Sequence, residues 1–188
     1  MKILKIVIIA TVSIFLIGSV CGIINMQIKY PNPNEHYYSL NETFSFDSCE
    51  ITVTDCRTWD LNSFCSEHDI DNFLVNITET ENIHMCMVTV DVKNIGTEPI
   101  KPELYQMYLG DRACTTGLDL SFYLALNDDS SEMLNPTIDP GDTVTVELPF
   151  TMYGTTWGQK DGDFLKLIDL ELTVALYPDK YVVKLDTN

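Results

Sequence analysis

A strict alternation of apolar and polar residues constrains this fold more than any other feature of the sequence. It is clearest in the stretch CMVTVDV, residues 86–92, where every second residue is cysteine or valine. Successive side chains of a β-strand point to opposite faces, so one face of this segment is apolar. The same alternation returns at 143–152 and 170–176. All three segments are therefore predicted to be half-buried strands.

Turn signals divide the rest of the chain into further short segments. DPGD, residues 139–142, places proline and glycine in the two central positions of a type II turn. Further strands are expected at 43–56, 73–80, 103–109, 118–126 and 180–185. The polar stretch 56–72 is expected to be a loop or a short helix. About eight short strands with almost no helical periodicity predict an all-β, antiparallel β-sandwich, with a closed barrel as the alternative.

The N-terminal residues differ in kind from the rest. Lys2 and Lys5 precede an uninterrupted apolar run of 19 residues, 6–24. That length is close to the ~20 helical residues that cross a bilayer core, so a single N-terminal transmembrane helix is predicted. A cleaved signal helix is one alternative. Lipid attachment at Cys21 is another, although the preceding GSV matches a lipoprotein box poorly.

The distribution of charge predicts the orientation and excludes one class of partner. Two lysines precede the apolar run and only Lys29 directly follows it, which favours a cytoplasmic N-terminus and an extracellular C-terminal domain at the cell membrane. None of the 28 acidic residues and only three of the 11 lysines and arginines precede Tyr30, so residues 30–188 carry a net charge of −20. Such a surface repels nucleic acid, and we expect no nucleic-acid partner.

The composition also suggests where the domain begins. Residues 1–29 are assigned to a membrane anchor or signal segment. Residues 30–42, rich in proline and asparagine and without apolar periodicity, are expected to be a tether. Residues 43–188 are expected to form the sandwich, which is large enough to bury a core of its own.

The strand and turn motifs resemble a known family. MVTVDVKNIG, residues 87–96, fits a VxVxNxG strand ending, and the PG turn at 140–141 precedes the next long strand. Together with the N-terminal apolar run, this resembles bacterial exported immunoglobulin-like domains of unknown function, related in fold to a mycobacterial immunoprotective antigen. The resemblance covers roughly residues 40–176 and implies an immunoglobulin-like sandwich. It implies no catalytic or binding residues. The cysteines within 56–72 and the degenerate lipoprotein box depart from that family's pattern.

Cysteine pairing is open at this stage. Five cysteines follow residue 29, so at least one thiol is unpaired or bonded to another chain. Cys56 and Cys65 bracket a polar segment and could form a local bridge, while Cys49 and Cys86 could link two core strands. In a reducing environment all five could be free.

Three segments contain metal-ligating residue types. HMCM, residues 84–87, contains the soft ligands that Cu(I) prefers, but a strand would point them alternately to opposite faces. CSEHDIDN, residues 65–72, lacks the second ligand pair that structural zinc sites use. NDDSSE (127–132) and DGD (161–163) lack the glycine and glutamate spacing of a calcium-binding EF-hand. No metal site and no cofactor are therefore predicted.

The sequence also contains no GxSxG motif and no phosphate-binding glycine loop, and we expect no catalytic activity. Trp59 and Trp157 stand in irregular segments and could contribute to an exposed binding surface. The predicted function is a non-catalytic, membrane-anchored binding or structural module on a bacterial surface, with a protein, peptide or cell-envelope ligand. An exported domain that handles copper, zinc or calcium is the alternative, and a small cysteine-dependent enzyme is a third hypothesis.

Overall fold

The structure is a computed structural model that describes residues 2–70, 83–111, 114–126, 135–154, 157 and 169–185. The chain forms two compact units, Met1–Asn34 and Glu35–Asn188. The first contains helix α1, Lys2–Lys29. Its segment Thr11–Lys29 is long and apolar enough to cross a membrane. At 1.5 Å per residue the segment spans about 28 Å, which matches a hydrocarbon core of about 30 Å.

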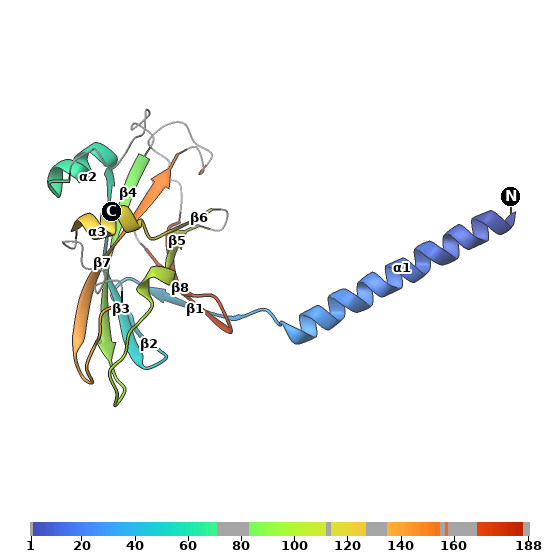
Figure 1. The fold of residues 1–188 in the computed structure, drawn as a ribbon, viewed down its shortest axis with the longest axis horizontal. Coiled ribbons are helices and arrows are strands. Elements are labelled where there is room, and N and C mark those ends of the chain that lie inside the picture. The colour runs from blue at the N-terminus through green and yellow to red at the C-terminus, as the bar shows by residue number, and fades with distance from the viewer. Residues whose placement is uncertain are drawn as a thin grey trace. The chain divides into compact units, whose positions relative to one another are not determined.

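The second unit is a sandwich of two sheets (Figure 1). One sheet contains, in spatial order, β1 (Asn34–Ser39), β9 (Asp179–Lys184), β8 (Glu171–Ala175), β5 (Tyr108–Gly110) and β6 (Thr115–Gly117). The other contains β2 (Thr43–Phe46), β3 (Cys49–Asp60), β4 (Ile83–Asn94) and β7 (Thr143–Tyr153). In this second sheet the neighbouring pairs β2–β3, β3–β4 and β4–β7 are all antiparallel. The predicted antiparallel β-sandwich is therefore confirmed.

The main core lies between the two sheets. Val90 is fully buried and lies in register with Val53 of β3 and Val146 of β7. Leu109 and Leu172 are buried on the inner face of the other sheet. Each strand places every second side chain in this layer, as the alternation in the sequence predicts.

A second hydrophobic cluster covers the outer face of the four-stranded sheet at one end. Met85 and Met87 of β4 pack there with Phe64 of helix α2 (Leu61–Glu67) and Phe122 of helix α3 (Leu120–Leu126). Figure 1 shows α2 and α3 at the same end of β4 and β7. The first half of β4 is consequently buried on both faces.

Short polar contacts begin both helices. Asp60 caps α2, because its side chain accepts a hydrogen bond from the backbone N–H of Ser63 at 3.0 Å and from the Ser63 hydroxyl at 2.5 Å. These bonds lower the pKa of Asp60. At α3, the Asp119 carboxylate accepts hydrogen bonds from the Ser121 N–H at 3.1 Å and the Thr151 hydroxyl at 2.5 Å. Asp119 therefore starts α3 and attaches it to β7.

Asn94 links three segments at the opposite end of β4. It is fully buried, and its amide nitrogen donates to the carbonyls of Glu98 at 2.8 Å and Ile138 at 2.9 Å. Its side-chain oxygen accepts from the Gly96 N–H at 2.8 Å. Its backbone carbonyl accepts from the N–H of Gly141, whose φ of +87° suits glycine. The asparagine and glycines of the sequence motif thus join the end of β4 to the PG turn.

Several expectations about individual segments are wrong. Residues 34–39 of the expected tether form β1, because Tyr38 stacks on Phe44 with ring centroids 4.2 Å apart and β1 lies beside β9. Within 118–126, the expected strand is helix α3. Its start at the Asp119 cap, together with buried Phe122 and Tyr123, explains the difference.

Three further segments differ in detail. In 103–109, Leu104 and Met107 are buried three residues apart, and a 3-10 helix at Leu104–Gln106 precedes the short β5. β3 extends to Asp60, so the polar stretch that starts at residue 56 begins as strand and continues as α2. Leu176 lies outside β8 and is 51 % exposed, contrary to the predicted alternation. The strand predicted at 73–80 lies outside the described residues.

The register of β4 can be tested by a pair of neighbouring substitutions. Val90→Asp should prevent folding, because it places an unpaired charge in the fully buried inter-sheet layer. Thr89→Asp points to the other face, between Asp55 and Glu147, and should cost about 1 kcal/mol through like-charge repulsion. Thermal melting followed by circular dichroism measures both; equal tolerance of the two variants would contradict this register.

The role of Asn94 gives a second test. Asn94→Ala removes three side-chain hydrogen bonds and leaves buried backbone groups unsatisfied, so it should destabilise the domain by roughly 2–3 kcal/mol. That loss corresponds to a fall in Tm of roughly 5–10 °C. Asn62→Ala, at an exposed position of α2, is the matched control and should change Tm by about a degree or less. Equal melting temperatures for the two variants would show that Asn94 does not link these segments.

Candidate functional site

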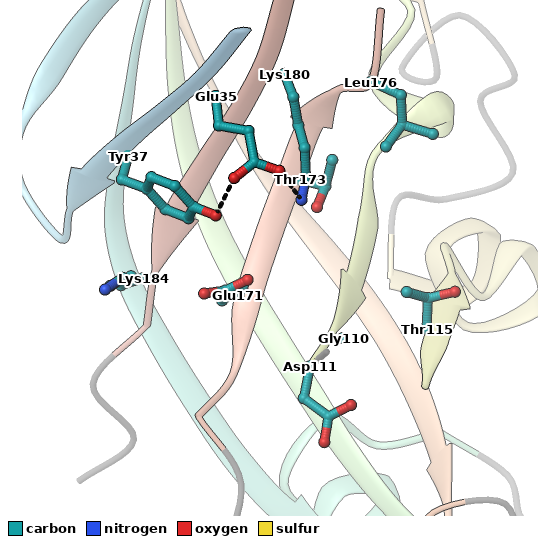
Figure 2. Close-up of a pocket in the computed structure, with 10 residues that line it drawn as sticks. All are labelled: Glu35, Tyr37, Gly110, Asp111, Thr115, Glu171, Thr173, Leu176, Lys180 and Lys184. Carbon is teal, nitrogen blue, oxygen red and sulfur yellow. Dashed lines mark hydrogen bonds and ion pairs between the residues drawn. The ribbon is translucent and has the colours of Figure 1, made fainter. Parts of the chain in front are cut away.

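The outer face of the five-stranded sheet carries a groove of about 570 Å³ (Figure 2). All five strands of the sheet or the turns that follow them contribute to it. The lining residues are Glu35, Tyr37, Gly110, Asp111, Thr115, Glu171, Thr173, Leu176, Lys180 and Lys184. Because side chains alternate along each strand, the residues next to these in the chain, such as Leu109 and Leu172, face the core instead. The side chains that face outward from these strands therefore line the groove, and those that face inward form the core.

One end of the groove has an ordered set of polar contacts. The Tyr37 hydroxyl donates to Oε2 of Glu35 at 2.7 Å, and Nζ of Lys180 lies 3.4 Å from Oε1 of the same carboxylate. The hydrogen bond from Tyr37 and the charge of Lys180 lower the pKa of Glu35. Lys184 stands over the Tyr37 ring, 5.4 Å from its centroid. These contacts position groups of both charges along β1 and β9.

At the other end of the groove, the carboxylates of Glu171 and Asp111 lie near Gly110, where the backbones of β5 and β6 approach each other closely. Glu171 of β8 lies in register with Gly110 of β5 and with Lys184 of β9. A Cβ at Gly110 would stand 2.4 Å from the Cys114 carbonyl oxygen, so only glycine fits where β6 folds back on β5. Asp111 accepts the Cys114 N–H at 2.8 Å, which fixes this turn. Glycine at position 110 therefore permits the tight approach of β6 to β5 next to Glu171.

The groove can bind ligand groups of either charge. It offers carboxylates at Glu35, Asp111 and Glu171, ammonium groups at Lys180 and Lys184, and hydroxyls at Tyr37, Thr115 and Thr173. A second hollow, about 600 Å³ in volume, opens between the sheets beside Phe46, Met107 and Val174. Its lining combines core residues with the side chains of Asp47, Lys101, Glu103 and Gln106, whereas eight of the ten residues that line the groove are polar or charged.

The two tryptophans proposed as a binding surface lie against different clusters. Trp59 is partly buried, packs edge-on against Phe64 at 5.5 Å, and donates its indole N–H to Glu67 at 2.6 Å. It also borders a small hollow of about 80 Å³. Trp157 is partly buried against the inter-sheet core. The structure does not bring the two indoles together, and binding at either one stays a prediction.

The cysteines are distributed differently from the pairs considered in the sequence. Cys49 lies opposite Asn94 in β4, eight residues from Cys86, which corresponds to about 26 Å along the strand. Cys65 is buried in the outer cluster, whereas Cys56 belongs to the inter-sheet core. Sγ of Cys56 instead lies 3.5 Å from Sγ of Cys86. In the structure none of these four cysteines is joined by a disulfide.

The stretch HMCM lies in β4 and divides its side chains as a strand requires. Met85 belongs to the outer cluster, and Cys86 belongs to the inter-sheet core. One ion therefore cannot collect ligands from both. Across the described residues, no group of three or more His, Cys, Asp and Glu side chains converges to hold a metal ion.

The remaining metal-like segments are only partly described. Within 65–70, burial raises the pKa of the Cys65 thiol, which disfavours the thiolate form that zinc binds. His68 packs its ring against Phe64, with centroids 4.6 Å apart. Residues 71 and 72, the segment 127–132 and the segment 161–163 lie outside the described residues.

Sequence reasoning did not identify the groove. The available signal is a pair of polar residues at alternate positions, Glu35 and Tyr37 in one segment and Glu171 and Thr173 in another. The tether interpretation of 30–42 hid the first of these. β1 lies beside β9 in the sheet, and the contact between His36 and Asp179 joins residues that are 143 positions apart in the sequence. No local sequence pattern predicts a pairing between segments so far apart.

Burial of His84 predicts a pH-dependent stability. Burial lowers the pKa of His84 below its ordinary value of 6.5, although Asp60 and a backbone hydrogen bond to Trp59 oppose the shift. As pH falls through about 6.5, the unfolded chain takes up a proton at this site that the folded chain does not, so stability is lost toward acid. His84→Gln should show a smaller fall in Tm between about pH 7 and pH 5 than the unsubstituted protein. Identical pH profiles would contradict the prediction.

Comparison with known proteins gives a family and several solved structures. The model of a family described as a domain of unknown function, DUF5028, matches residues 35–181. No curated protein matches the sequence. The chain is similar to an uncharacterised β-sandwich protein from Clostridium difficile, at 12% identity and TM-score 0.48, over 82% of this chain and 96% of that one.

Two other solved structures are similar at comparable levels. A functionally unknown protein from Listeria monocytogenes has 16% identity and TM-score 0.49, covering 78% of this chain and 82% of that one. The secreted protein MPT63 from Mycobacterium tuberculosis has 10% identity and TM-score 0.46, covering 82% and 98%. The family match spans most of the chain and confirms the resemblance to domains of unknown function. This chain therefore belongs to the DUF5028 family.

Proposed function

We propose that this protein is a non-catalytic binding module, held at the outer surface of a bacterial membrane by its N-terminal helix, whose ligand lies in the groove of the five-stranded sheet. The observation that carries the proposal is the groove itself. It is about 570 Å³ in volume, and four of the five strands place charged or hydroxyl groups in it. A volume of this size accommodates a small ligand or a short peptide.

The lining favours a polar ligand that bears both amino and carboxylate groups. Glu171 can accept from an ammonium group, and Lys184, one strand away in register, can donate to a carboxylate. Three carboxylates and two ammonium groups in one groove would leave a singly charged or apolar ligand poorly matched. Short peptides and peptide-bearing components of the cell envelope have the required chemistry.

The N-terminal helix supports attachment to a membrane. The segment Thr11–Lys29 contains no acidic residue and exposes large apolar side chains such as Phe15 and Ile17. Lysines at positions 2 and 5 before the apolar run, against only Lys29 directly after it, favour retention of the N-terminus in the cytoplasm and export of residues 30–188.

The state of the cysteines supports a role without catalysis. Burial raises the pKa of Cys49 and of Cys65, and the contact with the Cys56 thiol together with burial raises the pKa of Cys86. A cysteine nucleophile requires the opposite shift, because the thiolate is the reactive form. A metal-handling role is carried by no observation in the described part of the chain.

Binding in the groove can be tested with matched charge variants. The full chain, purified in detergent, is titrated by calorimetry with a panel of short peptides that have free amino and carboxyl ends, including soluble peptidoglycan stem peptides. Lys184→Ala and Glu171→Gln should each weaken binding by about tenfold or more, since a charged hydrogen bond contributes about 1.5–3 kcal/mol.

The controls are Lys93→Ala and Glu147→Gln, which remove the same charges from the outer face of the four-stranded sheet. They should leave the affinity unchanged. Binding that is weakened equally by the controls, or a panel in which no peptide binds the unsubstituted protein, would contradict the proposed site.

A further inference from the structure

Two thiol groups lie close together on the inner face of the four-stranded sheet. Cys56 of β3 and Cys86 of β4 both belong to the inter-sheet core, 8 % and 0 % exposed, and their Sγ atoms are 3.5 Å apart. The contact with Cys56 and burial raise the pKa of Cys86 well above its usual value.

The strand register shows why these two cysteines meet. Cys56 lies opposite Val88, and Cys86 lies opposite Thr58, so the two are diagonal neighbours on the same face of adjacent strands. Diagonal Cα atoms in a regular antiparallel pair are about 7–8 Å apart, slightly more than most disulfides span. A bulge between Val53 and Asp55 lies immediately before Cys56. Bulges increase local twist and bend the strand, which gives β3 freedom to bring the sulfurs closer.

We infer that Cys56 and Cys86 form a disulfide when the domain folds outside the cytoplasm. The inference rests on the proposed export, because disulfides persist mainly in exported proteins. The two thiols are oxidised, each losing one hydrogen, and an Sγ–Sγ bond forms. The oxidant is the disulfide of an exported thiol–disulfide oxidoreductase or a small disulfide, which is reduced to two thiols.

The bond would stabilise a specific part of the domain. It closes a loop in which the two cysteines are 30 residues apart. That loop contains all of α2 together with Ile83 and Met85 of the outer cluster. Cross-linking its ends restricts the unfolded chain and thereby favours the folded one. Cys49, Cys65 and Cys114 remain as thiols, which accounts for the odd number of cysteines outside the apolar run.

Peptide mapping tests the pairing directly. The full chain in detergent is refolded with a mixture of reduced and oxidised glutathione, alkylated during unfolding, and digested without reduction. A peptide pair linked through Cys56 and Cys86 is expected, with Cys49 and Cys65 alkylated. Alkylation of both Cys56 and Cys86, or linkage of either one to Cys49 or Cys65, would overturn the inference.

A thermal measurement provides an independent test. Dithiothreitol should lower the Tm of the oxidised unsubstituted protein by roughly 5–15 °C, and that of the control Cys65→Ala equally. It should leave Cys86→Ala and Cys56→Ala unchanged. An equal fall in either of these two variants would overturn the inference. The readout is independent of groove binding, so loss of the proposed ligand site would not be mistaken for loss of the bond.

Discussion

The burial of β4 on both faces is the constraint on which the rest of the structure depends. Its even-numbered residues from Cys86 to Val92 face the five-stranded sheet, and its odd-numbered residues from Ile83 to Met87 face α2 and α3. A shift of one residue in register would exchange the two sets. β3 and β7 pair with β4 along nearly its whole length, so the register of β4 also determines which of their side chains face the core. The soft ligands of HMCM are therefore packing residues of two separate clusters.

Asn94 connects the end of β4 to neighbouring segments of the chain. One buried side chain bonds to the segments that contain Gly96, Glu98 and Ile138. The isolated bridge between Ile100 and Ile138 continues the same connection. The sequence motif that resembled a family therefore consists of a hydrogen-bond junction and its turn. Because the junction is buried, it specifies the fold and gives no information on the ligand.

The long strands could be predicted from the sequence because their pattern is local. β4 and β7 repeat with a period of two, and each ends at glycine or proline turn signals. β1, α3 and the groove could not be predicted in this way. α3 depends on contacts of Asp119 with Thr151 and with the Pro149 carbonyl, 32 and 30 residues away. β1 depends on aromatic stacking between Tyr38 and Phe44 and on its place beside β9. Such contacts appear only when the whole chain is folded.

The two outer faces of the sandwich have different chemical roles. α2 and α3, the α-helices described within Glu35–Asn188, both pack against the four-stranded sheet and complete an apolar cluster there. On the five-stranded sheet, the corresponding positions are Glu35, Tyr37, Glu171, Thr173 and Lys184. Charged side chains at strand positions contribute little to stability when they are exposed. Side chains of both charges at these positions are better explained by ligand binding than by folding, which is why we propose the function for the sheet against which α2 and α3 do not pack.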